Sequence, residues 1–259
     1  MKRVNHRYGW VKDNRDNRDV VLRTPRVEDK KLPEKVDIRD KCPKITDQGK
    51  LGSCVAHGVA TAISVNLKTN GFEGFNPSKL FLYYNGRILE GTVEIDAGMQ
   101  IRNCVKGANR FGVCDENLWP YLEEKFNVFP NKVSFETAKK NRPFVYNRVI
   151  QEGQSIKEFL AHNIPIVCGM VVYDTLESGE ASKTGVVHLP EPKEKSLGGH
   201  CIVLVGYDDT TKFFICRNSW GESWGDNGYF YLPYDYVLNP RLAMDFWSVR
   251  VINSDKNMF

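Results

Sequence analysis

The stretch QGKLGSCVAHGVATAISVNLKTNG, residues 48–71, decides the fold of the first half of this chain. After Cys54, apolar residues recur at helical spacing, and Gly71 follows as a stop signal. The residues that carry this spacing are Val55, Val59, Ala62, Ile63 and Leu67. The pattern predicts a largely buried helix that begins at Cys54. Ser53, directly before it, is a residue type favoured at a helix N-cap.

Cys54 is a candidate nucleophile because of its place at this helix start. The unpaired backbone N–H groups and the positive end of the helix dipole favour a thiolate over a thiol. Gly49 and Gly52 in the preceding loop allow close approach of another backbone, and the side-chain amide of Gln48 can donate to an oxyanion. The alternative is an ordinary buried cysteine after a Gly-Ser turn.

A reactive thiol needs a base, and the chain has five histidines. Four are weak candidates: His6 lies in a polar tract, His162 and His188 fall in turns or loops, and His57 shares the helix of Cys54 but would point into its packing. His200 differs, because it follows two glycines and opens the apolar run 201–206, which predicts a buried strand. His200 is therefore the predicted base.

Asn218 is the predicted partner of this base. It follows a second predicted strand, 212–216, which the short segment 208–211 joins to the strand of His200. A hairpin of these strands would bring the two side chains together, and the asparagine oxygen could then fix the imidazole tautomer. Trp220 could shield that hydrogen bond from water; the alternative is an ordinary aromatic residue of the sheet.

Four motifs in this order resemble the papain-like (cathepsin-type, C1) cysteine peptidases. They are LPEKVDIR from Leu32, QGKLGSCVA around Cys54, GGHCIVLVGYDD around His200 and ICRNSWGESWGDNGYFYL around Asn218, and the resemblance runs from Leu32 to the last predicted strand, 246–252. It implies an α+β fold of two lobes, one helical and one rich in antiparallel strands, with the active-site cleft between them.

The resemblance also implies the role of each site residue. Cys54 would be the nucleophile, His200 the base and later the acid, and Asn218 the orienting residue, while Gln48 and the Cys54 N–H would form the oxyanion hole. Substrate contacts are expected at Ser53, Gly98, Gly199 and Trp220. The chain would then hydrolyse peptide bonds through an acyl-enzyme thioester, as an endopeptidase, without a metal or another cofactor.

Two other functions use the same residues. The first is acyl or amide transfer to an acceptor other than water. The second is a non-catalytic peptide-binding protein on a peptidase scaffold, which the intact set of Gln48, Cys54, His200 and Asn218 argues against.

The predicted organisation is an N-terminal leader, residues 1–31, and one peptidase domain, 32–259, with a mainly helical lobe over 32–150 and a mainly β lobe over 151–259. The GWVKD motif at 9–13 resembles the short leader of bacterial and viral members of the family. We expect Tyr8 and Trp10 to anchor the leader along the cleft and restrict access to Cys54. The alternative is a disordered tail.

Other sequence features bear on compartment and partners. Leu51 stands where many secreted relatives have a disulfide-forming cysteine, and Val55 stands where they have a tryptophan. Neither an apolar signal region nor a run of about 18 apolar residues is present. A net charge of +4 with 26% charged residues is too mild to indicate nucleic-acid binding. We therefore expect an intracellular, cytoplasmic monomer with reduced thiols, no membrane contact and a polypeptide substrate.

Overall fold

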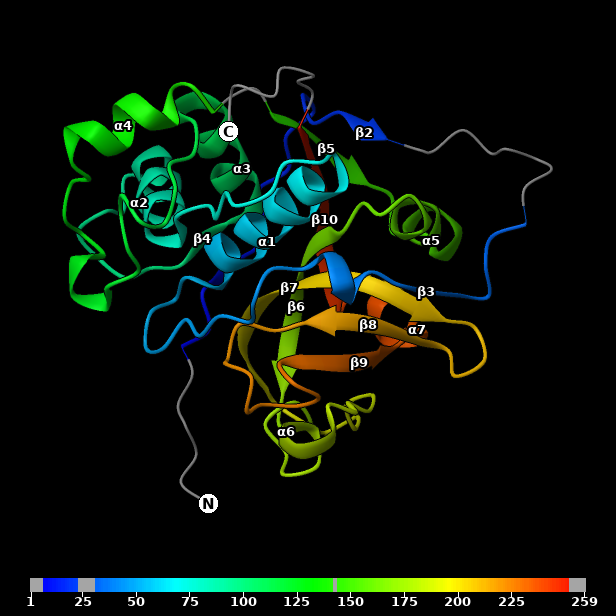
Figure 1. Ribbon diagram of the computed structural model, residues 1–259. Coiled ribbons are helices and arrows are strands. Elements are labelled where there is room, and N and C mark those ends of the chain that lie inside the picture. Colours follow the sequence, from blue (N-terminus) through cyan, green and yellow to red (C-terminus); the bar gives the residue numbers. More distant parts are fainter. Residues whose placement is uncertain (1–6, 23–30, 142–143, 252–259) are drawn as a thin grey trace.

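The structure is a computed structural model that describes residues 7–22, 31–141 and 144–251. Helices gather on one side and strands on the other (Figure 1). The helical side holds α1 (Cys54–Thr69), α2 (Lys79–Glu90), α3 (Ile101–Phe111) and α4 (Lys132–Ala138). Three shorter helices accompany the strands: α5 (Gly153–Ala161), α6 (Ala181–Thr184) and α7 (Tyr234–Val237). Single 3-10 turns occur at Arg39–Lys41 and Glu123–Lys125.

Helix α1 confirms the predicted helix, since it begins at Cys54 and is buried from Cys54 to Leu67. The N-cap expectation is only half right. Ser53 occupies the N-cap position, but its side chain makes no capping hydrogen bond. Its hydroxyl lies 2.6 Å from the Tyr121 hydroxyl instead. Two of the N–H groups at the start of this helix, those of Cys54 and Val55, face the sulfur of Cys54.

The strands form an eight-stranded sheet in the order β2-β5-β10-β6-β7-β8-β9, with β3 paired to β7. Their bounds are Val21–Leu22 (β2), Lys35–Asp37 (β3), Phe144–Val149 (β5), Ile166–Tyr173 (β6), Ser196–Asp208 (β7), Phe213–Arg217 (β8), Tyr229–Pro233 (β9) and Ala243–Val251 (β10). Most neighbours run antiparallel, and β2 pairs with β5 in parallel. Strands β2, β3 and β5 belong to this sheet although they precede residue 151.

Strand β7 is longer than the sequence predicts. It begins at Ser196, so His200 lies inside the strand rather than opening it. The two glycines before His200 continue the pairing with β6, Gly198 opposite Val172 and Gly199 opposite Val171. Strand β8 ends at Arg217, and Asn218 follows it directly. The predicted hairpin of β7 and β8 is confirmed, with Val203 opposite Arg217.

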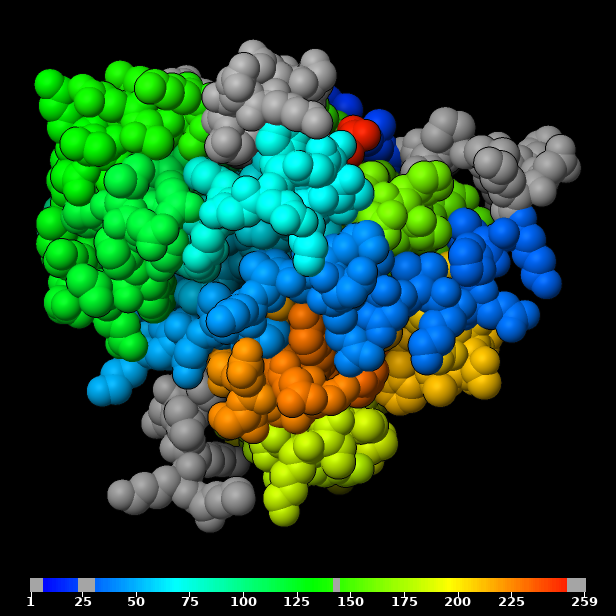
Figure 2. Space-filling view, in the orientation of Figure 1, coloured from blue at the N-terminus to red at the C-terminus, as the bar shows by residue number. Residues whose placement is uncertain are grey.

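Helix α1 lies between the two lobes and packs on β7 and β10. One hydrophobic cluster joins α1 residues such as Val59 and Ile63 to Val203 of β7 and Trp247 of β10. Each large apolar side chain buried in this way contributes about 1.5–3 kcal/mol. The position of Cys54 is thus fixed by packing on both lobes. Figure 2 shows the segment that leads to this helix, in blue, crossing between the helical part and the strands.

The described part of the leader, residues 7–22, is built into both lobes. Strand β1 (Trp10–Val11) pairs in parallel with β4 (Met99–Gln100), and β2 extends the large sheet beside β5. Trp10 and Asp13 are buried, at 8% and 7% exposure. The remainder of the predicted leader, residues 1–6 and 23–30, lies outside the described residues.

Candidate active site

Cys54 is fully buried at the first position of α1. The backbone N–H of Cys201 lies 3.4 Å from its sulfur, and the N–H groups of Gly9, Val55 and Cys54 itself also face it. Burial nevertheless raises the pKa of the thiol to about 11. The sequence argument for a thiolate therefore fails in this closed arrangement, because desolvation outweighs the helix start.

His200 and Asn218 lie side by side, as the sequence predicts. The distance between His200 Nε2 and Asn218 Oδ1 is 2.9 Å, and both side chains are buried. The Trp220 ring stacks on the His200 ring, with centroids 4.7 Å apart and an interplanar angle of 29°. Because the Cys201 N–H reaches the sulfur of Cys54, the residue next to His200 already touches the thiol.

Gln48 is held in place on both ends of its amide. Its Oε1 accepts from the Ser219 hydroxyl at 2.7 Å, so its Nε2 must point toward the Cys54 loop, where it donates to the Leu51 carbonyl at 2.8 Å. The Tyr121 hydroxyl donates to the Gln48 carbonyl at 2.8 Å. Ser219 and Tyr121 were missed at the sequence level. Ser219 stands between two predicted site residues and could have been found, whereas no local signal marks Tyr121.

The leader runs over this constellation. Gln48 Nε2 donates to the Arg7 carbonyl at 3.0 Å, and the Gly9 carbonyl accepts from the Met99 N–H at 2.9 Å. A Cβ added to Gly9 would overlap the Gly52 carbonyl, so only glycine fits there. The leader group that faces the Cys54 thiol is the backbone N–H of Gly9. A peptide N–H is not an electrophile, so the thiol cannot attack it.

The two aromatic residues that flank Gly9 in the leader, Tyr8 and Trp10, contact different parts of the site. The Tyr8 ring lies 6.2 Å from the His200 ring and 6.3 Å from the Trp220 ring. Trp10 lies against Gly169 and Gly199, where an added Cβ at either glycine would overlap the indole. These glycines therefore shape the space that the indole fills.

The four predicted substrate-contact residues lie in different surroundings. Gly199 contacts Trp10 of the leader, and Trp220 contacts Tyr8. Gly98 packs against Gly9, but its own N–H donates to the Tyr83 hydroxyl, and the leader pairs with the next residue along, Met99. Ser53 is fully buried, and its hydroxyl meets that of Tyr121.

Farther along, the leader is held by a cluster of charged groups. Asp13 accepts from the Trp247 indole at 2.8 Å and from Arg148 at 2.9 Å. Arg148 also reaches Asp19 at 2.7 Å and Asp245 at 3.3 Å, and Arg102 donates to Asp19 at 3.0 Å. We call these residues the anchor cluster. Burial and the nearby Asp245 charge raise the pKa of Asp13 to about 6.

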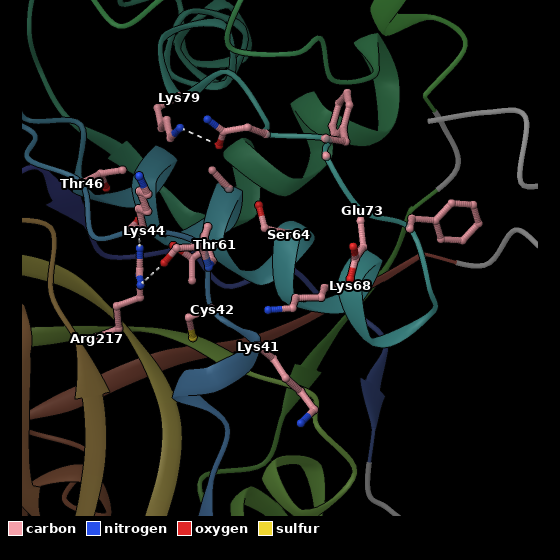
Figure 3. A pocket seen from close by; sticks show the side chains of 16 residues that line it. Lys41, Cys42, Lys44, Thr46, Thr61, Ser64, Lys68, Glu73, Lys79 and Arg217 are labelled. Atoms are coloured by element: carbon pink, nitrogen blue, oxygen red, sulfur yellow. Dashed lines mark hydrogen bonds between the residues drawn. The ribbon is translucent and has the colours of Figure 1, made fainter.

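A separate hollow of about 460 Å³ lies on another side of α1 (Figure 3). Five basic residues, Lys41, Lys44, Lys68, Lys79 and Arg217, line it together with the acidic Glu73, and Thr61 and Ser64 of α1 also border it. Several of these cations already have partners: Arg217 donates to the Pro43 carbonyl, and Lys79 pairs with Glu116. The hollow does not contain Cys54.

Within residues 7–22, 31–141 and 144–251, no group of three or more His, Cys, Asp or Glu side chains could hold a metal ion. In the same ranges, none of the helices is long and apolar enough to span a bilayer.

The fold, with the buried Cys54 in contact with the strand that carries His200, has the two-lobed α+β architecture of the papain-like cysteine peptidases. The model of the papain family cysteine proteases matches residues 32–241, so this chain belongs to that family. It is 36% identical to an uncharacterised peptidase C1-like protein of Acanthamoeba polyphaga mimivirus over 96% of this chain and 88% of that one.

Solved structures agree with this assignment. Xylellain, a cysteine protease from Xylella fastidiosa, superposes with a TM-score of 0.90 at 34% identity, covering 98% of this chain and 99% of the other. Procathepsin B from Trypanosoma congolense shares the fold, with a TM-score of 0.72 at 18% identity over 93% of this chain and 85% of the other. The family and the viral or bacterial resemblance expected from the sequence are thereby confirmed.

Proposed function

We propose that this cysteine peptidase cleaves peptide bonds with Cys54 as nucleophile, His200 as base and acid, and Asn218 as the residue that orients His200. The observation that carries the proposal is the 2.9 Å contact of His200 Nε2 with Asn218 Oδ1, beside a strand residue that already touches the sulfur of Cys54. With Nε2 turned toward Asn218, the proposal assigns the other ring nitrogen, Nδ1, to proton exchange with the thiol.

The reaction has two halves. His200 takes the proton of the Cys54 thiol, the thiolate attacks the substrate carbonyl carbon, and Gln48 Nε2 with the Cys54 N–H stabilises the oxyanion. The imidazolium then gives its proton to the departing amine, and a thioester remains. Water, deprotonated by His200, hydrolyses the thioester and restores the thiol.

The leader inhibits this site in the same proposal. Gln48 Nε2, the donor needed by the oxyanion, is taken by the Arg7 carbonyl. Tyr8, on the N-terminal side of Gly9, lies beside His200, whereas a substrate must place its leaving amine, on its C-terminal side, next to that base. The leader thus runs against the direction of a substrate and blocks the cleft without presenting a cleavable bond to Cys54.

The test is labelling of the full chain with an epoxide-type thiol inhibitor, before and after the substitution Trp10→Ala. We expect slow labelling of the native chain, fast labelling of the variant and none when Cys54→Ala is added. Substitution is preferable to deletion of the leader, because β1 and β2 are part of the sheets. A Trp10→Ala chain that neither reacts at Cys54 nor hydrolyses peptides would sink the proposal.

A further inference from the structure

His57 is a buried histidine that the proposed reaction does not use. It lies on α1, one turn after Cys54, with 3% of its surface exposed. Its Nδ1 is 2.8 Å from the Thr46 hydroxyl, and its ring stands edge-on to Tyr121, with centroids 4.9 Å apart. Its Nε2 is buried and has no hydrogen-bond partner within the described part of the chain.

A small cavity adjoins both His57 and Asn218. Its volume is about 10 Å³, and it lies between α1, the middle of β7 and the end of β8. The residues that line it are Thr46, His57, Gly58, Thr61, Cys201, Val203, Arg217, Asn218 and Ser219. A space of this size, bordered by polar groups, holds one water molecule and no more.

Asn218 supplies the second unsatisfied group. Its Oδ1 accepts from the Ser219 N–H at 2.8 Å and lies 2.9 Å from His200 Nε2, so the amide is turned with Nδ2 away from His200. Nδ2 is buried and, among residues that the structure describes, lacks an acceptor. A buried donor without an acceptor is costly, and Asn218 itself is only 3% exposed.

The two groups are chemically complementary. Asn218 Nδ2 can only donate, and His57 Nε2 accepts when Nδ1 carries the proton and donates to Thr46. The neutral ring that this requires is favoured, because burial and the charges of Lys79 and Arg217 lower the pKa of His57 to about 3. Figure 3 shows Lys79, Thr46 and Arg217 together around the neighbouring hollow.

We propose that His57 is a positioning residue for the His200–Asn218 pair, acting through one buried water that accepts from Asn218 Nδ2 and donates to His57 Nε2. The inference rests on the proposed function, since it assigns a role within that site. The water keeps Nδ2 satisfied on the side away from His200, so that Oδ1 stays aimed at His200 Nε2. The hydrogen bond between Asn218 Oδ1 and His200 Nε2 keeps the imidazole in the orientation that proton transfer requires.

The kinetic test compares His57→Phe with His57→Gln in the full chain, with and without Trp10→Ala. Phenylalanine keeps a flat ring but removes the acceptor, and kcat should fall about tenfold at unchanged KM, as for one lost buried hydrogen bond. The alkaline limb of kcat/KM should move to lower pH, because a poorly held Asn218 stabilises the His200 imidazolium less. His57→Gln should restore kcat and the position of the alkaline limb, since the glutamine Oε1 can accept the hydrogen bond that His57 Nε2 accepts.

The matched control is His162→Phe, which changes an exposed histidine at the end of α5 and should leave kcat and the pH profile as they were. A His57→Phe chain that is merely less stable would lose active enzyme without shifting the alkaline limb. That result, or a His57→Gln chain as impaired as His57→Phe, would overturn the proposal.

A second readout does not depend on activity. A high-resolution crystal structure of the full chain should show one water within hydrogen-bond distance of His57 Nε2 and Asn218 Nδ2. Nitrogen-15 NMR should show His57 as the Nδ1–H tautomer at neutral pH. Absence of the water, or an Nε2–H tautomer, overturns the inference while leaving the peptidase mechanism intact. A chain whose Cys54 never reacts instead refutes the proposed function, and the water and tautomer still decide the role of His57.

Discussion

The leader contacts the rest of the protein in two regions that are held by different kinds of interaction. In the cleft, residues 7–11 make backbone hydrogen bonds and pack aromatic rings on glycines, and the exposed Arg7 side chain pairs with the buried carboxylate of Asp96 at 3.1 Å. In the anchor cluster, Asp13 and Asp19 enter a buried set of charges with Arg102, Arg148 and Asp245. The cleft contact depends on shape, whereas the anchor depends on charge balance.

The anchor cluster is not neutral. Three carboxylates, those of Asp13, Asp19 and Asp245, share two guanidinium groups. Arg148 contacts all three, so its loss would leave several buried charges uncompensated. The cleft region has no such dependence, because its main anchor, Trp10, is apolar and its indole N–H lacks a partner among the described residues. The two regions should therefore respond differently to substitution and to pH.

The largest expected effect is in the cleft. Trp10→Ala removes a buried indole, a change that typically costs about 3–5 kcal/mol, and should raise the labelling rate of Cys54 by about a hundredfold or more. Trp10→Phe is the matched control. It keeps a ring on Gly169 and Gly199 and forfeits no hydrogen bond, so it should remain mostly closed. Equal labelling of Trp10→Ala and the native chain would show that the cleft contact does not hold the leader.

The next effect is in the anchor cluster. Arg148→Met should destabilise the chain by about 3 kcal/mol, measured as a lower midpoint of guanidinium unfolding, because buried carboxylates lose their shared cation. Arg18→Met serves as control, since the exposed Arg18 pairs with Asp16 at the surface and should matter by less than about 0.5 kcal/mol. Similar midpoints for the two variants would contradict the buried-charge account.

The third prediction separates the regions by pH. Docking raises the pKa of Asp13 from 3.8 to about 6, so protonation favours the docked leader. This contribution is fully present below about pH 4 and is lost as pH rises through about 6; it amounts to about 3 kcal/mol at most. The native chain should thus release its leader more readily at pH 7.5 than at pH 4.5.

Asp13→Asn isolates this effect. The asparagine does not titrate, so the ratio of its labelling rate to that of the native chain should change between pH 4.5 and 7.5, with the thiol chemistry cancelling in the ratio. The ratio should be highest at low pH, where the native leader is held best. A ratio independent of pH would assign any pH effect to another group.

The smallest effect concerns the enzyme without the leader. Tyr121→Phe in the Trp10→Ala chain removes the hydroxyl that donates to the Gln48 carbonyl and meets Ser53. One such hydrogen bond is worth about 1 kcal/mol, so kcat should fall about fivefold at constant KM, with little change in leader release. An altered KM with normal kcat would place Tyr121 in substrate binding rather than in the Cys54 loop.

Much of the site could be predicted because its signals are local. The helix after Cys54 has a regular apolar spacing, and the β7–β8 hairpin is set by two apolar runs with a short connection, so the meeting of His200 and Asn218 follows. The sequence-based predictions were wrong where residues distant in sequence set the surroundings of a side chain. The hydroxyl of Ser53 does not cap the helix because it hydrogen-bonds with the hydroxyl of Tyr121, which is distant in sequence. Burial disfavours the thiolate expected at Cys54, and no local sequence pattern predicts that burial.

The sequence by itself determined the family, the order of the site residues and the helix that carries the nucleophile, because these depend on short-range periodicity and on motifs. Only the tertiary structure decided the pairing of Gln48 with Arg7, the buried charges around Arg148 and the cavity that His57 shares with Asn218. These features join segments more than 40 residues apart. The free energies of these contacts depend on desolvation and on which distant segments meet, and neither can be predicted from a local stretch of sequence.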